Sequence, residues 1–276
     1  MDANDFLASL PASSVDLVLT SPPYWCQRTY GSDPRELGTE PVVTDYVNHL
    51  VAILESAWNV VKPEGWMAIN LGDTYANQPG QYRHSDKASV SRSNKANAGS
   101  APLRSLTGLP LKTQAAVPER VKIALIARGW RCRNTIIWHK SSPLPTTASD
   151  RWNLSYEVVH CFARSAKSYF SRQEYGSFAS YGTHDVWSVN PARRRATTHP
   201  AVMPEDLVAR IIDQLCPPNG MVIDPFAGSG TVLRVARSRG RIASGTDLYD
   251  WSNESGRVGT GSERGDDDTD RGHDAQ

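Results

Sequence analysis

The segment of the sequence most suited to chemistry is Ser21-Pro22-Pro23-Tyr24, which directly follows the apolar run Val15–Thr20. A short apolar run that stops at Ser-Pro-Pro is typical of a buried strand that ends in a loop. The two prolines fix the backbone and carry no N–H, so we expect their carbonyl oxygens to be held rigidly and to point outward. An exocyclic amine on cytosine or adenine has two N–H donors. The Ser21 hydroxyl oxygen could accept one of them and the Pro22 carbonyl the other.

Such a pair of acceptors would hold the amine nitrogen with its lone pair facing an electrophilic methyl carbon, so no covalent nucleophile is needed. Tyr24 adds an aromatic face on which a flipped-out base can stack. A cytosine C5 methyltransferase would instead need a cysteine nucleophile, usually after proline, and Cys26 follows Trp25. By itself, Ser-Pro-Pro-Tyr is also typical of a rigid loop or a polyproline ligand, so its meaning depends on the rest of the chain.

A glycine-rich turn late in the sequence has the composition of a nucleotide-type site. The run Met221–Asp224 leads into it, a helix follows to Arg239, and the next strand, Arg241–Thr246, precedes Asp247. In such a unit the glycines let the backbone approach a ligand, and the acid after the second strand can accept both ribose hydroxyls. The turn lacks the Lys-Ser/Thr ending of a phosphate-binding loop, and a tight connection without a ligand is the alternative. The residues of the turn are Asp224, Pro225, Phe226, Ala227, Gly228, Ser229, Gly230 and Thr231.

Hydrophobic periodicity predicts alternating strands and helices around these two segments. We predict strands over residues 15–20, 66–71, 133–139, 156–163, 221–224 and 241–246. We predict helices over residues 44–61, 118–128, 204–216 and from the glycine-rich turn to 239. Thr44 is the expected N-cap of the first helix, and residues 62–65 are expected to form a turn. Strands that alternate with helices indicate an α/β fold with a largely parallel, doubly wound sheet.

The composition of the 276-residue chain excludes several classes of protein. It contains no run of about 18 apolar residues and no basic flank at the N-terminus, so we expect no membrane span, no secretory signal and a cytoplasmic location. The cysteines are scattered, so we expect neither a metal site nor disulfides. The net charge is +1, but residues 252–276 carry seven acidic residues against three arginines. We expect that acidic tail to be disordered, and the remaining 27 basic and 22 acidic residues make the folded part mildly basic.

Together, the two segments resemble those of the N4-cytosine/N6-adenine DNA methyltransferases, the amino-methyltransferases of restriction–modification systems and phages. The catalytic segment precedes the cofactor segment, which is similar to the permuted β group of that family, in which target recognition lies between them. The resemblance covers about residues 2–250. Further blocks agree with it: Glu36-Leu37-Gly38 with Tyr46, Val61–Gly65, Leu71–Tyr75, Trp138-His139-Lys140 and His199-Pro200-Ala201.

The resemblance implies a Rossmann-like, S-adenosylmethionine-dependent methyltransferase domain over residues 1–251, with double-stranded DNA as its substrate. Ser21, Pro22, Pro23 and Tyr24 would form the catalytic amine site. The implied cofactor-binding residues are Asp224, Pro225, Phe226, Gly228, Gly230, Thr231 and Asp247, with Thr198, His199 and Pro200 beside the methionine part of the cofactor. No metal is implied. A cognate restriction endonuclease is a further implied partner, and both a monomer and a dimer stay open.

Serine rather than aspartate at the first catalytic position is similar to the cytosine-N4 members, so we favour cytosine N4, with adenine N6 as the alternative. The family usually has a further strand before Asp2 and a helix after Asp247, and we find neither in the sequence. A truncated, catalytically weak relic that binds cofactor or DNA is therefore an alternative to an active enzyme. A methyltransferase for protein or RNA is less favoured, because Asn-Pro-Pro-Tyr is the usual form for protein glutamine and Ser21 departs from it.

Basic residues gather in two regions between the catalytic and cofactor segments, as contacts to phosphates require. Residues 76–115 form an expected mobile basic insertion with six lysines and arginines. Residues 140–196 are the expected target-recognition region, and within it the triplet Arg193-Arg194-Arg195 is our favoured DNA contact. Two tryptophans, Trp138 and Trp152, suit either the core or stacking on a base.

Overall fold

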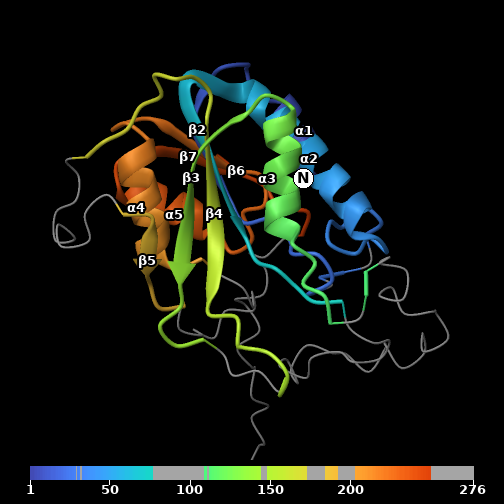
Figure 1. Cartoon of the computed structure of the whole chain (residues 1–276). Helices are drawn as coiled ribbons and strands as arrows, with labels where there is room; N and C mark the ends of the chain where they lie inside the picture. The colour runs from blue at the N-terminus through green and yellow to red at the C-terminus, as the bar shows by residue number, and fades with distance from the viewer. Residues whose placement is uncertain are drawn as a thin grey trace, which may run out of the picture.

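The structure, a computed structural model, describes residues 1–28, 30–31, 33–76, 109–110, 112–143, 148–172, 184–191 and 203–249. Within them a seven-stranded sheet separates two layers of helices (Figure 1). One face is covered by α1 (Ala3–Ala8), α2 (Val43–Val60) and α3 (Val117–Ala127). The other is covered by α4 (Glu205–Leu215) and α5 (Thr231–Ser238). This is the doubly wound α/β architecture that the alternating pattern predicts.

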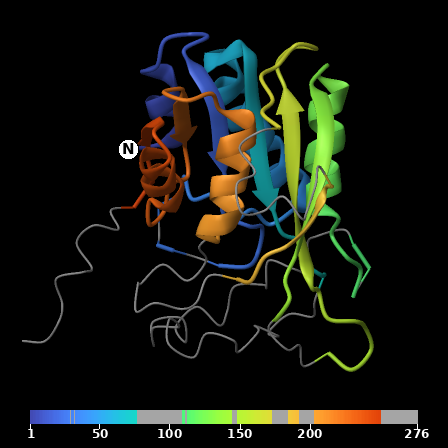
Figure 2. The same ribbon diagram turned by 90° about the vertical axis from the view of Figure 1, so that its left-hand side faces the viewer.

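The order of the strands in the sheet is β5-β3-β4-β2-β1-β6-β7. The strands are β1 (Val15–Thr20), β2 (Val61–Leu71), β3 (Arg131–His139), β4 (Tyr156–Ala163), β5 (Val186–Ser188), β6 (Met221–Asp224) and β7 (Ile242–Gly245). β4 runs antiparallel to its neighbours β2 and β3, and the other neighbouring pairs are parallel (Figure 2). The amino end of β4 therefore shares one edge of the sheet with the carboxyl ends of the remaining strands.

The sheet is buried on both faces, and this explains why its strands are apolar almost throughout. In β1, Val15 and Val18 pack in the cluster that includes α1, α2 and α3. Leu17 and Leu19 pack in the cluster that includes α4 and α5. Because both faces of β1 are buried, its sequence is a nearly continuous apolar run rather than an alternation of apolar and polar residues.

Two local expectations are wrong. α2 begins at Val43 after Val42 as its N-cap, with no side-chain cap, so Thr44 lies inside the first turn. Residues 62–65 belong to β2 rather than to a turn, and they bulge out of its pairing with β1. The register places Val15 opposite Val61 but Leu17 opposite Trp66, and the strand continues through this irregularity. The helix α1 and the short edge strand β5 were not predicted.

The basic insertion expected over residues 76–115 lies mostly outside the described residues, but its two ends are joined. The Ala76 N–H donates to the Thr113 carbonyl at 2.8 Å, and Tyr75 pairs with Gln114 in an isolated antiparallel bridge. The insertion therefore leaves and re-enters the fold at one place, next to the carboxyl end of β2.

The region 140–196 contains β4, which is a central, buried strand of the sheet. β4 is therefore part of the core, and the prediction of target recognition, which stays a prediction, narrows to the segments on either side of it. The Arg193-Arg194-Arg195 triplet lies outside the described residues, as does the tail 252–276. The two tryptophans are separated by the structure, since Trp138 is 4% exposed and Trp152 is 93% exposed. In the described part of the chain, no helix is long and apolar enough to span a membrane.

Candidate active site

The catalytic and cofactor segments meet at the shared edge of the sheet. β1 pairs with β6, with Val18 opposite Ile223, and this register brings the last residues of the two strands together. The Thr20 hydroxyl donates a 2.6 Å hydrogen bond to Asp224 Oδ1, and both side chains are buried. Two segments separated by 204 residues are thus held side by side, as the prediction of a single site requires.

The two proline carbonyls of the catalytic loop differ in their surroundings. The Pro23 carbonyl accepts a 2.9 Å hydrogen bond from the Tyr46 hydroxyl, so the expectation that it points outward is wrong. The Pro22 carbonyl has no hydrogen-bond partner among the described residues. Behind the loop, Trp25 Nε1 donates to the Glu40 carbonyl at 2.8 Å. Pro23 therefore anchors the loop, and Pro22 keeps the carbonyl that can receive an amine.

Tyr24 is tied into a polar network that the sequence did not reveal. Its hydroxyl donates to Glu157 Oε2 at 2.7 Å and accepts from Asn70 Nδ2 at 2.8 Å. The Ser21 hydroxyl lies 3.4 Å from the Tyr24 hydroxyl, and Lys140 donates to the second oxygen of Glu157 at 2.5 Å. Burial first, and then the Glu157 charge, raise the pKa of Tyr24 well above its ordinary value. Tyr24 therefore stays protonated and acts as a donor.

The ring of Tyr24 lies against Gly72, the residue that follows β2. A Cβ atom at position 72 would lie 2.6 Å from Tyr24 Cε2, so only glycine leaves room for the ring. The next residue, Asp73, accepts the N–H groups of Ala116 and Val117, each at 3.0 Å, and so caps α3. The Leu71–Tyr75 block thus links the active site to the start of α3.

The glycine-rich turn separates the roles of its two acids. Asp224 is 2% exposed, and its Oδ1 accepts the Phe226 N–H at 3.0 Å in addition to the Thr20 hydroxyl. Burial raises the pKa of Asp224 to about 7, although both hydrogen bonds oppose the shift. Asp247 is only half-buried and accepts the Gly228 N–H at 2.9 Å. The other oxygen of Asp247, Oδ1, accepts the Tyr249 N–H at 3.0 Å. Asp224 therefore shapes the turn from within, whereas Asp247 joins the turn to the residues after β7 and is partly accessible.

The remaining residues predicted to bind the cofactor lie in a turn with open space beside it. Gly228 and Gly230 adopt left-handed backbone conformations, with φ of 50° and 76°. A Cβ atom at Gly230 would have no heavy atom within 4 Å, so the space beside the turn is open. Pro225 is buried, and Thr231 is buried as the first residue of α5. Thr198, His199 and Pro200 lie outside the described residues.

A buried glutamate connects the catalytic loop to the residues after Asp247. Glu36 accepts the Tyr30 N–H at 2.6 Å, the Gly31 N–H at 3.0 Å and the Tyr249 hydroxyl at 2.8 Å. The resemblance included Glu36 in a block but gave it no role. Its contacts indicate that Glu36 holds the loop after Ser-Pro-Pro-Tyr against the segment that follows β7, in which Asp247 lies.

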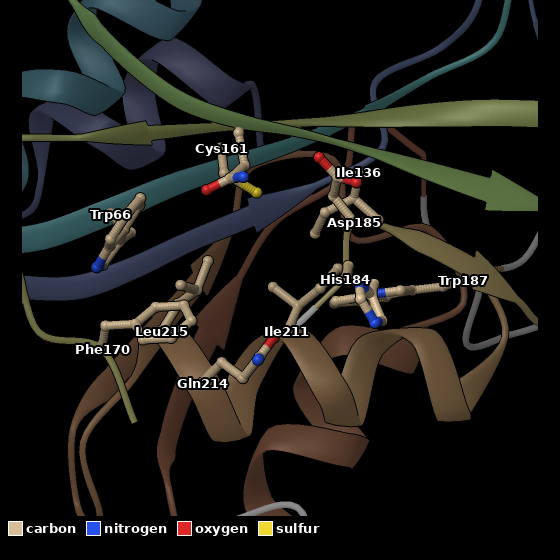
Figure 3. Close-up of a pocket in the computed structure, with 11 residues that line it drawn as sticks. Trp66, Ile136, Cys161, Phe170, His184, Asp185, Trp187, Ile211, Gln214 and Leu215 are labelled. Carbon is tan, nitrogen blue, oxygen red and sulfur yellow. The ribbon is translucent and has the colours of Figure 1, made fainter. Parts of the chain in front are cut away.

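A small pocket of about 50 Å³ lies elsewhere, between the sheet and α4 (Figure 3). Its lining includes Trp66, Cys161, Trp187 and Leu215 but none of the residues predicted for the site. Burial raises the pKa of the Cys161 thiol to about 12, so this thiol is a poor nucleophile. In the described ranges, no group of three or more His, Cys, Asp or Glu side chains could hold a metal ion.

Comparison with known proteins identifies the family of this chain. The profile of the N6_N4_Mtase family, described as DNA methylase, matches residues 15–251. The chain belongs to this family. Type II methyltransferase M.Cfr9I of Citrobacter freundii is 34% identical over 251 residues, which cover 90% of this chain and 81% of the relative. Type II methyltransferase M.SmaI of Serratia marcescens is 31% identical over 253 residues, or 90% of this chain and 84% of the relative.

Solved structures share the fold. The PvuII DNA methyltransferase (cytosine-N4-specific) superposes with a TM-score of 0.67 at 20% identity, covering 90% of this chain and 80% of that one. TTHA0409 of Thermus thermophilus, in a structure complexed with S-adenosyl-L-methionine, superposes with a TM-score of 0.61 at 22% identity. That match covers 90% of this chain and 86% of the other. The predicted methyltransferase fold is thereby confirmed.

Proposed function

We propose that this protein transfers a methyl group from S-adenosylmethionine to the exocyclic N4 amine of cytosine at specific sites in double-stranded DNA. The observation that carries the proposal is the Thr20–Asp224 hydrogen bond, because it joins the amine-binding loop to the glycine-rich turn at one edge of the sheet. The names of the relatives support a role in a Type II restriction–modification system, with a cognate endonuclease as partner, and phage DNA protection is the other setting.

The residues of the turn suit S-adenosylmethionine. Bound there, this group would supply an electrophilic methyl carbon on a sulfonium. Asp247 has the position and partial exposure needed to accept ribose hydroxyls, and Gly228 and Gly230 keep side chains away from the ligand. Asp224 Oδ1 accepts from Thr20 and Phe226, so Asp224 would stabilise the turn and would not contact the ligand with both oxygens. The complex of TTHA0409 with S-adenosyl-L-methionine adds a precedent on the same fold.

The amine site supplies two acceptors of different kinds. Ser21 Oγ and the Pro22 carbonyl would each accept one N–H of the base amine, which leaves the nitrogen lone pair to attack the methyl carbon directly in line. The carbon–sulfur bond breaks as the carbon–nitrogen bond forms, and the excess proton on nitrogen leaves to water. Serine at position 21 supports cytosine N4 over adenine N6.

Duplex DNA would approach the strand edge that carries both segments, and the target base would flip out of the helix to reach Ser21. The loop between β3 and β4 projects from that edge. Its Trp152 is 93% exposed, and Arg151 stacks on Tyr75 at 4.1 Å. An exposed aromatic residue with neighbouring cations suits contact with bases and phosphates.

The test is nucleoside mass spectrometry of duplex DNA treated with the protein and S-adenosylmethionine. We expect N4-methylcytosine from the wild type, none from Ser21→Ala, and full yield from Ser56→Ala, a serine on α2 remote from the site. Detection of N6-methyladenine instead would mean that the target is adenine N6 and not cytosine N4. The absence of any methylated base with mixed-sequence DNA would favour the catalytically weak relic.

A further inference from the structure

The hydrogen bonds behind Ser21 end on an ion pair for which the proposed function has no role. Glu157, at the amino end of β4, accepts from Lys140 Nζ at 2.5 Å and from the Tyr24 hydroxyl at 2.7 Å. The side chains of Glu157 and Lys140 are only 15% and 22% exposed. Removing a carboxylate from water is costly unless strong donors compensate for it. The buried Glu157–Lys140 ion pair next to the candidate active site therefore suggests that its charges have a role in the site.

Chemistry fixes the direction of each hydrogen bond in this network. An ionised carboxylate only accepts, so Tyr24 gives its single hydroxyl proton to Glu157. The Tyr24 oxygen is left with lone pairs, and these face Asn70 Nδ2 at 2.8 Å and Ser21 Oγ at 3.4 Å. Ser21 is thereby led to donate its own proton toward Tyr24.

This direction decides what Ser21 can offer a substrate. With its proton turned toward Tyr24, the Ser21 oxygen presents only lone pairs, one of which faces Asn70 Nδ2 at 3.4 Å. Another lone pair is available for the N–H of a target amine. In the reverse direction, Ser21 would donate to the amine nitrogen and occupy the lone pair that must attack. The reverse chain would therefore oppose the reaction.

Asn70 supports the same direction at a cost in stability. It is 1% exposed, and its Nδ2 also donates to Glu157 at 3.0 Å. Its Oδ1 is buried without a hydrogen-bond partner among the described residues. A buried unpaired acceptor costs about 1–3 kcal/mol, which an apolar residue would avoid. Turning the amide over would place Oδ1 against the Glu157 carboxylate, so the donors stay directed at Tyr24 and Glu157.

We propose that Glu157, paired with Lys140, is a positioning residue that sets the direction of the chain from Ser21 through Tyr24 and so keeps the Ser21 hydroxyl an acceptor for the target amine. The inference rests on the proposed function, since it needs an amine at Ser21. Glu157 acts through Tyr24 and Ser21 and contacts neither the base nor the methyl group.

Single-turnover methyl transfer tests the proposal, with DNA and cofactor affinities measured separately. We expect Glu157→Gln to lower the transfer rate about 10- to 100-fold, the equivalent of one hydrogen bond to a charged group, with both Kd values nearly unchanged. Tyr24→Phe should lower it similarly, and the double variant should be no slower than the slower single one, because both changes break the same chain. The proposal would be contradicted if the rate losses of the two single variants multiplied in the double variant, or if Glu157→Gln kept the wild-type rate. A rate loss explained by weaker binding would also contradict it.

A control and a second measurement separate this inference from the proposed function. Glu55→Gln, which removes an exposed carboxylate paired with Arg128, should leave the rate unchanged. In NMR spectra, the Tyr24 hydroxyl proton should be protected and shifted downfield in the wild type, and this signal should be lost in Glu157→Gln but kept in Glu55→Gln. A signal that survives Glu157→Gln would overturn the inference even in a protein without activity. A wild type that methylates no DNA but keeps this signal would overturn the proposed function, while the direction of the hydrogen bonds set by Glu157 would still stand.

Discussion

The Thr20 hydroxyl donates a 2.6 Å hydrogen bond to Asp224 Oδ1, and the same oxygen accepts the Phe226 N–H at 3.0 Å. One buried carboxylate thus holds the end of β1 and the turn that follows β6. The proposed amine-binding loop starts directly after Thr20, and Asp224 is the first residue of the glycine-rich turn. This contact therefore adds to the β1–β6 pairing in holding the two halves of the candidate active site together.

Replacing Thr20 with valine keeps the shape of the side chain but removes the hydroxyl. We expect Thr20→Val to lower the free energy of unfolding by about 1–3 kcal/mol, because Asp224 loses a buried donor. The affinity for S-adenosylmethionine should fall as well, since the turn loses a support. Thr20→Ser keeps the hydroxyl and should stay close to the wild type in both. Urea unfolding and calorimetric titration measure the two quantities, and equal behaviour of the two variants would contradict the role given to this contact.

The pKa of Asp224, raised by burial to about 7, predicts a pH dependence of stability. Because this value is above the ordinary 3.8, the folded protein binds the proton more tightly than the unfolded chain does. The resulting stabilisation is complete below about pH 4 and is lost as the pH rises through 7. At about 1.4 kcal/mol per pH unit, the loss is at most about 4 kcal/mol.

Asp224→Asn isolates this contribution, because asparagine keeps an acceptor oxygen for Thr20 and Phe226 but cannot ionise. The free energy of unfolding of the wild type should decline relative to that of the variant between pH 4 and pH 8. Urea unfolding at a series of pH values gives the difference directly. Parallel curves for the two proteins would mean that Asp224 titrates normally in the folded state.

Gly72→Ala should disturb Tyr24, since the new Cβ atom would lie 2.6 Å from the ring. We expect a loss of about 1–3 kcal/mol in the free energy of unfolding and a transfer rate lowered about tenfold or more, because the ring must move away from Ser21. Gly240→Ala is the control. It strains a left-handed backbone with φ of 70° but meets no atom within 4 Å, so its cost of about 1 kcal/mol should leave the transfer rate intact.

Asp73 caps α3 from a distant part of the sequence, through the N–H groups of Ala116 and Val117. Asp73→Ala should lower the free energy of unfolding by about 1–2 kcal/mol. Asp45→Ala removes a first-turn acid of α2 for which no capping hydrogen bond is present, and it should cost less than about 1 kcal/mol. A larger effect at Asp45 in chemical unfolding would argue against the cap.

Local patterns predicted most of the fold because its longer strands and helices are apolar or periodic enough to be recognised alone, whereas α1 with 6 residues and β5 with 3 are too short. The same patterns singled out Ser21 and Asp247, which stand at strand ends in compact motifs. The same reasoning placed a turn at residues 62–65, because Pro63 and Gly65 are turn-forming residues, whereas pairing with β1 kept the segment in β2. Tertiary pairing thus overrode local preference.

The network behind Ser21 could not be predicted in this way. Asn70 lies in β2, Lys140 follows β3, and Glu157 lies in β4, and only the antiparallel direction of β4 brings the three to one edge. No local spacing encodes that encounter. Likewise, the sequence could not reveal that the Pro23 carbonyl is occupied by Tyr46, since their contact depends on how α2 packs behind the loop.

Lys140 and Glu157 stand at the two ends of the loop that joins β3 to β4, and the Lys140 N–H also donates to the Ser155 carbonyl at 2.7 Å. The loop is therefore closed at its base, whatever its length or sequence beyond that point. If the loop reads DNA as proposed, we expect that exchange of residues 141–154 between homologues alters which DNA sequence is selected without displacing Lys140 and Glu157. We therefore expect that DNA-sequence specificity can change during evolution through this loop while the catalytic residues stay the same, provided that Lys140 and Glu157 are retained.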